Sequence, residues 1–337
     1  MFESIQFRNL KALRDTTLPL GRFTLLVGPN GSGKSTALEA FEMLRAPGNY
    51  TFATLASAAA RSSNHATVEI ILKWADPLDI VTLARWTADS NSGTQWFNRQ
   101  GSPFSGNAPY AAQEAQLRRV RIYSLAPESL AASVGLQPSM ELARNGTNLA
   151  GVLDRLRDQT PERFEALNEE VGRLLPEFDR VLFDTPAPGV RAFALRAREG
   201  HHAISATHVS HGSLLVLALL TLAHLPEPPS LIGLEEPDRG IHPRLLRDVR
   251  DALYRLCYPE SYGEKRGPVQ VIATTQSPYF LDQFKEHPEE VVIAEKKGLE
   301  ARFERLEGRP DIKEILAQAP LGEVWYSGIL GGVPTNR

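Results

Sequence analysis

The 337-residue sequence contains a single cysteine, Cys257, and therefore cannot form an internal disulfide. It also lacks an apolar N-terminal run of the kind that secretory signals carry. Its most apolar stretch, Ser213–Leu225, is too short to span a bilayer and is expected to form a buried helix. These absences exclude a disulfide-stapled secreted scaffold and predict a cytoplasmic protein with no membrane partner. Cys257 is expected to be a small buried side chain.

An excess of either charge is also missing. The chain has 37 Lys and Arg against 40 Asp and Glu, which gives a formal net charge of −3. The overall charge thus does not indicate a nucleic-acid binder, although it is compatible with a local basic face. With 42% hydrophobic and 23% charged residues, the composition is that of a globular protein with a sizeable core.

Hydrophobic periodicity predicts a mixed α/β chain. Helical spacing is expected at 147–159 and 160–175, with Thr147 and Thr160 as N-caps. Another helix should follow Pro243, and stretches rich in Ser, Asn and Gly predict loops at 90–93 and 99–109. Alternating or short apolar runs predict strands near the N-terminus and at 66–74, 79–86, 94–98, 118–125, 179–185, 190–197, 229–236 and 267–275.

The stretch GPNGSGKS fits the phosphate-binding pattern G-x-x-x-x-G-K-[ST] in full, and it lies between a predicted strand and a predicted helix. Glycines in such a loop let backbone N–H groups surround a phosphate, and the helix N-terminus adds a favourable field. Lys34 should reach the β- and γ-phosphates, and the Ser35 hydroxyl should ligate Mg²⁺. The predicted nucleotide-binding residues of the loop are Asn30, Gly31, Ser32, Gly33, Lys34, Ser35 and Thr36.

Two adjacent carboxylates, Glu235 and Glu236, end an apolar strand in SLIGLEEPD. Glu235 is expected to hold the Mg²⁺ shell. Glu236 is expected to orient or deprotonate the attacking water and is the predicted catalytic carboxylate.

Two further segments follow the order expected of an ABC-type ATPase. Ser210 and Gly212 directly precede the apolar helix, as in the signature segment that meets the γ-phosphate of an opposite subunit. In VIATTQSP a strand ends near Gln276, at the position of the catalytic switch residue that senses γ-phosphate. Either segment alone is a weak signal, because Ser and Gly before a helix are ordinary capping residues.

Together these motifs resemble stand-alone ABC-type ATPases of the group that includes RecF, the structural-maintenance-of-chromosomes (SMC) proteins and the overcoming-lysogenization-defect (OLD) proteins. The resemblance rests on FRNLKALRDTTLPLGRFTLLVGPNGSGKST, NGTNLAGVLDRL, LEEPDRGIHP and LGEVWYSGILGG. It implies ATP and Mg²⁺ as cofactors, and it places Arg8 and Asn9 near the nucleotide.

The resemblance also implies a fold and a domain layout. The expected fold is a P-loop NTPase of the ABC-type head class, with a mixed β core and an inserted helical lobe. A single composite domain is expected over 1–337. It comprises an N-terminal part at 1–126, a helical lobe with connecting strands at 127–205, and a C-terminal part at 206–337.

The sequence departs from that group at three positions. Gln276 stands where histidine is common, and a carboxamide can donate a hydrogen bond to phosphate but cannot titrate near neutral pH. His211 occupies the middle of the signature, and Glu235 replaces the usual aspartate. These departures are compatible with nucleotide binding and with slow or conditional hydrolysis. No glutamine is assigned to the Q-loop.

The lengths of the segments between and after these motifs reduce the number of possible functions. The gap between Ser35 and Ser210 lacks heptad repeats, so a coiled-coil arm that tethers DNA is not expected, and the segment after Gln276 is too short for a fused nuclease domain. A transporter subunit is disfavoured by VSHGS and TTQSP, which depart from the usual transporter motifs. What remains is an ATP-gated homodimer that acts on DNA or on a separately encoded nuclease or effector, in repair or phage defence. A scaffold that binds ATP without turnover is an open alternative.

Overall fold

The computed structural model describes residues 1–61, 65–75, 79–89, 92–99 and 110–333. The predicted loops at 90–93 and 99–109 lie largely outside these residues. The chain divides into two compact units, which are described separately. The first unit comprises Met1–Ile122, Pro229–Gly233 and Pro268–Arg337, and the second comprises Tyr123–Pro228 and Leu234–Gly267. The predicted helical lobe at 127–205 lies within the second unit.

A six-stranded sheet forms the centre of the first unit, in the order β15-β14-β3-β13-β12-β7. Strand β3 (Phe23–Val27) pairs in parallel with β13 (Gln270–Thr275) and with β14 (Val291–Lys297). Every residue of β3 is buried, as expected for a central strand of a parallel sheet. The remaining strands are β7 (Val120–Tyr123), β12 (Leu231–Leu234) and β15 (Glu300–Arg305).

An antiparallel sheet in the order β2-β1-β4-β5-β6 holds the other strands of this unit. They are β1 (Phe2–Leu10), β2 (Leu13–Pro19), β4 (Thr67–Trp74), β5 (Ile80–Thr87) and β6 (Thr94–Arg99). Helix α1 (Lys34–Arg45) shares one hydrophobic core with this sheet, in which Phe41 contacts Phe2 and Phe2 packs edge-on against Trp74. Because the core reaches α1, it fixes the element that carries the end of the phosphate-binding motif.

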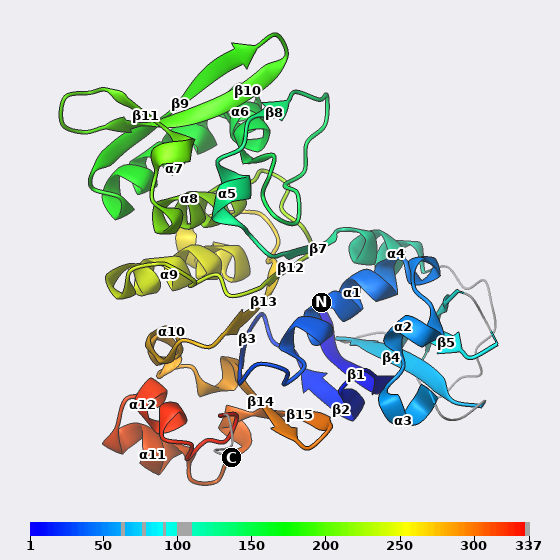
Figure 1. The fold of residues 1–337 in the computed structure, drawn as a ribbon. Helices are drawn as coiled ribbons and strands as arrows, with labels where there is room; N and C mark the ends of the chain where they lie inside the picture. The colour runs from blue at the N-terminus through cyan, green and yellow to red at the C-terminus, as the bar shows by residue number, and fades with distance from the viewer. Residues whose placement is uncertain (62–64, 76–78, 90–91, 100–109, 334–337) are drawn as a thin grey trace. The chain divides into compact units, whose positions relative to one another are not determined.

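Short helices complete the first unit (Figure 1). Helix α12 packs on α10, and the backbone N–H of Gly322 at the start of α12 donates to the Asp282 carboxylate at 2.7 Å. A Cβ atom on Gly322 would collide with the backbone of Pro278, so glycine is required for this close approach. The helices are α2 (Phe52–Leu55), α3 (Ala58–Arg61), α4 (Ala111–Arg118), α10 (Pro278–Leu281), α11 (Ile312–Gln318) and α12 (Leu321–Tyr326).

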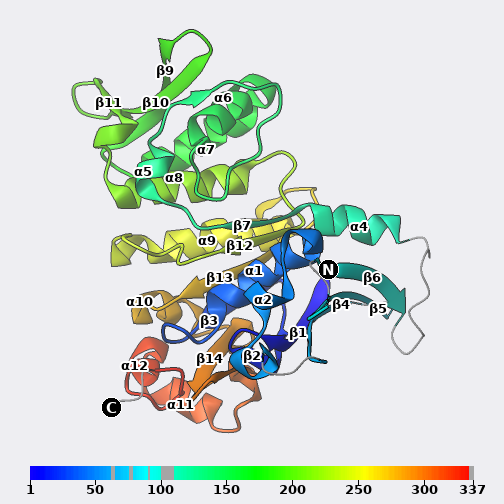
Figure 2. The same ribbon diagram turned by 45° about the vertical axis from the view of Figure 1, so that its right-hand side comes forward.

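The second unit combines helices with a small antiparallel sheet (Figure 2). Strand β10 (Val190–Ala197) pairs with β8 (Val134–Gly135), β9 (Phe178–Ala187) and β11 (Ala203–Ser205). Helix α8 is buried along nearly its whole length and packs against α5, α7 and α9, which confirms the predicted buried helix. Cys257, at the end of α9, is also buried as predicted. The helices are α5 (Pro127–Leu130), α6 (Leu149–Gln159), α7 (Pro161–Leu174), α8 (His211–His224) and α9 (Leu246–Cys257).

The predicted N-cap of α6 is wrong. The cap residue is Asn148 rather than Thr147, because the Asn148 side chain accepts from Ala143 N–H at 2.7 Å and donates to the Glu141 carbonyl at 2.7 Å. These two bonds fix the turn before the helix one residue later than the sequence suggested. Thr160 is the cap residue of α7 as predicted, but its hydroxyl donates back to the Leu156 carbonyl of α6 instead of accepting from its own helix.

A buried ionic cluster joins three elements of the second unit. The His224 side chain at the end of α8 is fully buried, and its Nδ1 lies 2.8 Å from the Leu220 carbonyl. Arg255 of α9 reaches His224 Nε2 at 3.1 Å and the Glu170 carboxylate at 2.6 Å. Because arginine can only donate, Nε2 accepts and Nδ1 carries the proton, so His224 is neutral. Burial lowers the His224 pKa, opposed by the Leu220 hydrogen bond and the charge of Glu170.

No helix among the described residues is long and apolar enough to cross a membrane.

Candidate active site

The loop between β3 and α1 has the backbone of a phosphate cradle. Gly31 and Gly33 have φ angles of 75° and 88°, which glycine adopts at little cost. Gly28 is buried against the Ala294 carbonyl of β14, where a Cβ atom would have no room. The glycines of the motif are therefore required by the geometry of the loop itself.

Lys34, the first residue of α1, directs its side chain back into this loop. The side chain is buried, and its Nζ donates to the carbonyls of Gly28 at 2.6 Å and Pro29 at 2.9 Å. A buried ammonium is costly unless polar groups surround it, and the two carbonyls meet that need. The charge is thus held where a phosphate bound in the loop would meet it.

The loop also offers donors of the kind that a phosphate requires. The N-cap residue of α1 is Gly33, which has no side chain to cap the first turn that Lys34, Ser35 and Thr36 form. The Ser32 hydroxyl is fully buried, and no residue that the structure describes bonds to it. A buried polar atom of this kind calls for a partner, and a phosphate oxygen supplies one. The residues therefore fit a nucleotide, with the exposed Ser35 hydroxyl as the candidate ligand for a magnesium ion.

The predicted switch residue lies at the phosphate-binding loop. Gln276 directly follows β13, and its Nε2 donates to the Asn30 side-chain oxygen at 2.9 Å. Parallel pairing of Thr275 with Val27 places the ends of β13 and β3 at the same edge of the sheet. The structure thus brings together two of the predicted residues that are far apart in the sequence.

The two predicted carboxylates directly follow β12 and belong to the second unit from Leu234 onward. The Glu235 N–H donates to the Tyr123 carbonyl at 2.9 Å, which carries the strand pairing one residue past β12. Glu236 has a φ of 44°, in the left-handed region that non-glycine residues seldom adopt. Such strain is concentrated at functional sites. The strained backbone turns the chain between the two carboxylates.

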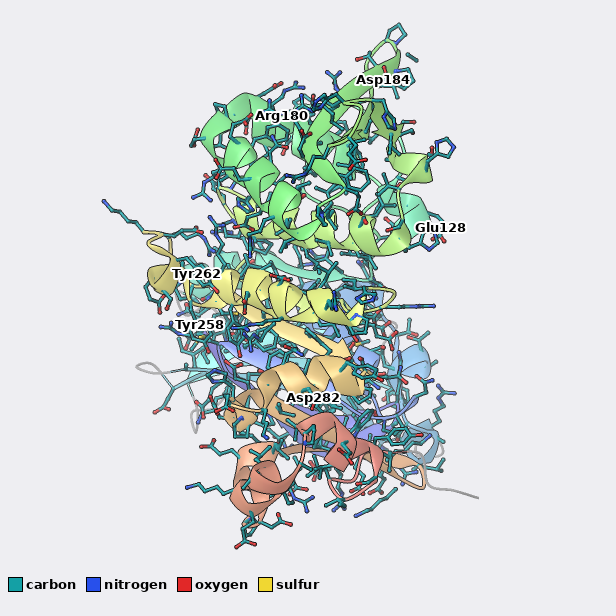
Figure 3. The ribbon with its side chains drawn as sticks, turned by 90° about the vertical axis from the view of Figure 1, so that its left-hand side faces the viewer. Glu128, Arg180, Asp184, Tyr258, Tyr262 and Asp282 are labelled. Atoms are coloured by element: carbon teal, nitrogen blue, oxygen red, sulfur yellow. The ribbon has the colours of Figure 1, made fainter. Side chains whose placement is uncertain are left out.

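The signature segment also lies in the second unit. Ser210 is the N-cap of α8, and its Oγ accepts from the Ser213 N–H at 3.2 Å. Gly212 packs against the turn that follows Glu236, since a Cβ atom on it would lie 2.7 Å from the Gly240 carbonyl. His211 Nε2 lies 3.8 Å from the carboxylate of Glu128 on α5, and both side chains are exposed. Glu128 is labelled in Figure 3. Ser210 and His211 are therefore the exposed residues at the start of this 14-residue helix, whereas Gly212 is half-buried and Ser213 is buried.

Arg8 and Asn9, which the resemblance places near the nucleotide, are held by residues of the antiparallel sheet. Arg8 pairs with the Glu69 carboxylate at 3.2 Å, and Glu69 also pairs with Arg85 at 2.7 Å. Asn9 adopts a positive φ of 58° and donates to the Thr67 carbonyl at 2.8 Å. A nucleotide contact by either side chain stays a prediction.

The histidines outside the signature have structural or solvent roles. His242 Nδ1 accepts from the Arg244 N–H at 3.2 Å, which confirms its interpretation as a turn residue. His201, His202 and His208 are exposed, and the described part of the chain holds no group of three or more His, Cys, Asp or Glu residues arranged to bind a metal ion.

One further side chain at this site, that of Lys296, was not predicted from the sequence. Lys296, near the end of β14, lies beside the phosphate-binding loop, with its Nζ 3.5 Å from the position of a Cβ atom built on Gly31. The apolar run VVIA before it is the one signal that could have predicted a strand there.

Comparison with known proteins identifies the family. The model of the family described as "AAA domain, putative AbiEii toxin, Type IV TA system" matches residues 23–282, a range that contains the phosphate-binding loop, both carboxylates and Gln276. The chain belongs to this family. The OLD nuclease of Thermus scotoductus is 46% identical to it over 44 residues, which are 13% of this chain and 8% of the nuclease. The chain thus spans less than a tenth of the curated relative that it matches.

Solved structures establish the fold of this AAA-domain protein. The SMC head bound to the C-winged helix domain of ScpA has a TM-score of 0.60 at 15% identity, over 90% of this chain and 96% of that chain. The SMC head domain from Thermotoga maritima has a TM-score of 0.53 at 15% identity, over 90% of this chain and 98% of that one. The predicted P-loop fold of the ABC-type head class is confirmed, and so is the resemblance to the group that includes RecF, SMC and OLD proteins.

Proposed function

We propose that this protein binds and hydrolyses ATP and acts as an ATP-gated dimeric switch in a DNA-associated process. The observation that carries the proposal is the hydrogen bond between Gln276 and Asn30, which joins the expected γ-phosphate sensor to an intact phosphate-binding loop. The family is one of P-loop ATPases, which supports nucleotide hydrolysis.

In this proposal each side chain has one role in hydrolysis. Lys34 and the backbone N–H groups of the loop would bind the phosphates. Ser35 and Glu235 would hold a magnesium ion, which would offset charge on the phosphates. Glu236 positions the attacking water and accepts its proton. Gln276 donates a hydrogen bond to the γ-phosphate in place of Asn30.

The position of the signature at the N-terminus of α8 supports dimerisation. Ser210 and the amides near Gly212 offer donors to an anion, with the field of α8 behind them. We propose that they bind the γ-phosphate held by a second copy of the chain. Each nucleotide would then join two subunits, and hydrolysis would separate them.

The DNA-associated role draws its support from the relatives. The family description names a toxin of a type IV toxin–antitoxin system, and the local match is to an OLD nuclease. On these grounds we propose DNA or a separately encoded nuclease or effector as partner, in phage defence or in repair. A regulatory scaffold that binds ATP with little turnover is the second candidate, favoured by Gln276 at the switch and His211 in the signature.

Two variants test the proposal. Lys34→Ala should lose at least about 10-fold in ATP affinity, because charge-assisted hydrogen bonds contribute about 1.5–3 kcal/mol each. Glu236→Gln should bind ATP as the unmodified protein does but release no phosphate. Binding is measured by calorimetry with and without Mg²⁺, and turnover by phosphate release.

The outcomes separate the candidates. Unchanged ATP binding by Lys34→Ala would disprove the nucleotide site. ATP binding without phosphate release by the unmodified protein, alone and with DNA, would favour the scaffold. Wild-type turnover by Glu236→Gln would show that the catalytic carboxylate lies elsewhere.

A further inference from the structure

Strand β14 runs beside the strand that leads into the phosphate-binding loop. Its residues Val291, Val292 and Ile293 pair in parallel with Leu25, Leu26 and Val27 of β3. The next residue, Ala294, places its carbonyl against Gly28, the first residue of the loop. Strand β14 therefore continues beside the segment that follows β3, where the phosphate-binding loop begins (Figure 1).

Lys296 lies two residues farther along β14, so its side chain leaves the strand on the same face as that of Ala294. Its Nζ reaches the loop near Gly31, 3.5 Å from the position that a Cβ atom on that glycine would occupy. The hairpin of β14 with β15 holds this position, since Lys296 is opposite Ala301, and Ala301 in turn lies 3.5 Å from a Cβ built on Gly33.

The two lysines at the end of β14 differ in their ion pairing. Lys297 pairs with Glu295 at 3.1 Å, whereas Lys296 pairs with no acidic residue that the structure describes. The Lys296 side chain is exposed, so its ammonium can move over the loop. An ammonium next to a phosphate cradle is attracted to any anion that binds there.

We propose that Lys296 is a second phosphate-contacting lysine of the nucleotide site, acting from β14 while Lys34 acts from α1. This inference rests on the proposed ATP site. The contact is to the polyphosphate and not to the base, because Lys296 lies at the phosphate-binding loop itself. It contributes to binding of any nucleoside triphosphate that the loop accepts.

The test is Lys296→Met, which keeps the length of the side chain and removes its charge. Lys297→Met is the matched control, one residue away in a similarly exposed position. Calorimetry should show about 10-fold weaker ATP binding for Lys296→Met, the effect of one charge-assisted hydrogen bond. Lys297→Met should bind as the unmodified protein does, and Lys296→Arg should recover most of the affinity. The loss should be smaller at high salt, since added ions screen an exposed charge.

Binding of a second nucleotide shows whether Lys296 contacts the phosphates or the base. If GTP also binds the unmodified protein, Lys296→Met should weaken ATP and GTP by the same factor, and weakening of ATP alone would overturn the phosphate assignment. Equal ATP affinities for Lys296→Met and Lys297→Met would also overturn the phosphate assignment. If Lys34→Ala loses ATP affinity in the same experiment, the ATP site itself stands. No ATP binding by the unmodified protein would overturn both proposals.

Discussion

The Gln276 carboxamide donates a 2.9 Å hydrogen bond to the Asn30 side chain, and this bond connects the end of β13 to the tip of the phosphate-binding loop. The donor is a group that stays neutral over the physiological range, unlike the histidine common at this position in the related ATPases. The switch therefore adds no protonation step of its own to hydrolysis.

Gln276→His tests that property. The imidazole should bring a titration with an apparent pKa near the ordinary histidine value of about 6.5 into the pH–rate profile of phosphate release. The unmodified protein should show no such step from this position. Gln283→His, a few residues farther along, is the control for a histidine elsewhere in the first unit. Identical pH–rate profiles for the unmodified protein and Gln276→His would contradict a switch role for Gln276.

The positive φ of Glu236 predicts a difference between two glycine substitutions. Glycine relieves backbone strain at Glu236, whereas at Glu235 it adds freedom to the unfolded chain without relieving such strain. Glu236→Gly should therefore be more stable than Glu235→Gly by about 1 kcal/mol in urea unfolding. Glu236→Gly should nevertheless release no phosphate. Equal losses of stability would show that the left-handed backbone at Glu236 carries no strain.

The His224 cluster predicts how stability depends on pH. Burial keeps the pKa of His224 below its ordinary value, so the unfolded chain takes up a proton near pH 6.5 that the folded protein does not. The unfolded state then binds more protons, and the free energy of unfolding should fall as the pH decreases below about 6.5.

Glu264 predicts a second decrease in the free energy of unfolding, at lower pH. Burial alone would raise its pKa, but hydrogen bonds from Arg255 and Arg266 outweigh burial and lower it. A carboxylate of this kind stabilises the fold above its unfolded pKa of about 4.3, and the contribution is lost as the pH falls through that value and below.

Urea unfolding at pH 7.5 and 5.5 separates the histidine contribution. His224→Gln should lose less stability than the unmodified protein between these two pH values, by on the order of 1 kcal/mol. His208→Gln, which replaces an exposed histidine of the same unit, is the control. An equal loss in His224→Gln and the unmodified protein would show that His224 does not titrate as the buried cluster requires.

The phosphate-binding loop could be predicted because its chemistry lies within eight consecutive residues. Predicting that Gln276 lies at this loop required more than a local motif. Its position depends on the order of segments along the chain and on the parallel pairing of β13 with β3. Helices α7 and α8 were predicted because their apolar periodicity or length is strong and local.

Two features of the structure could not be predicted from residue preference and periodicity alone. The β14–β15 hairpin follows a short apolar run with charged residues at its end, and its place beside β3 is a long-range pairing. Lys296 therefore could not be predicted as a site residue from the sequence. The cap of α6 was misplaced because side-chain bonds of Asn148 to Glu141 and Ala143, rather than residue preference, decide where that helix begins.

Light scattering with and without ATP tests the ATP-gated dimer most directly. Glu236→Gln, which should retain bound ATP, should be monomeric or weakly associated without nucleotide and dimeric with ATP and Mg²⁺. Adding Ser210→Arg should abolish the dimer while ATP binding to the phosphate-binding loop is kept, because the longer side chain occupies the place of the γ-phosphate. A double variant that still binds ATP and still dimerises on adding it would contradict the account.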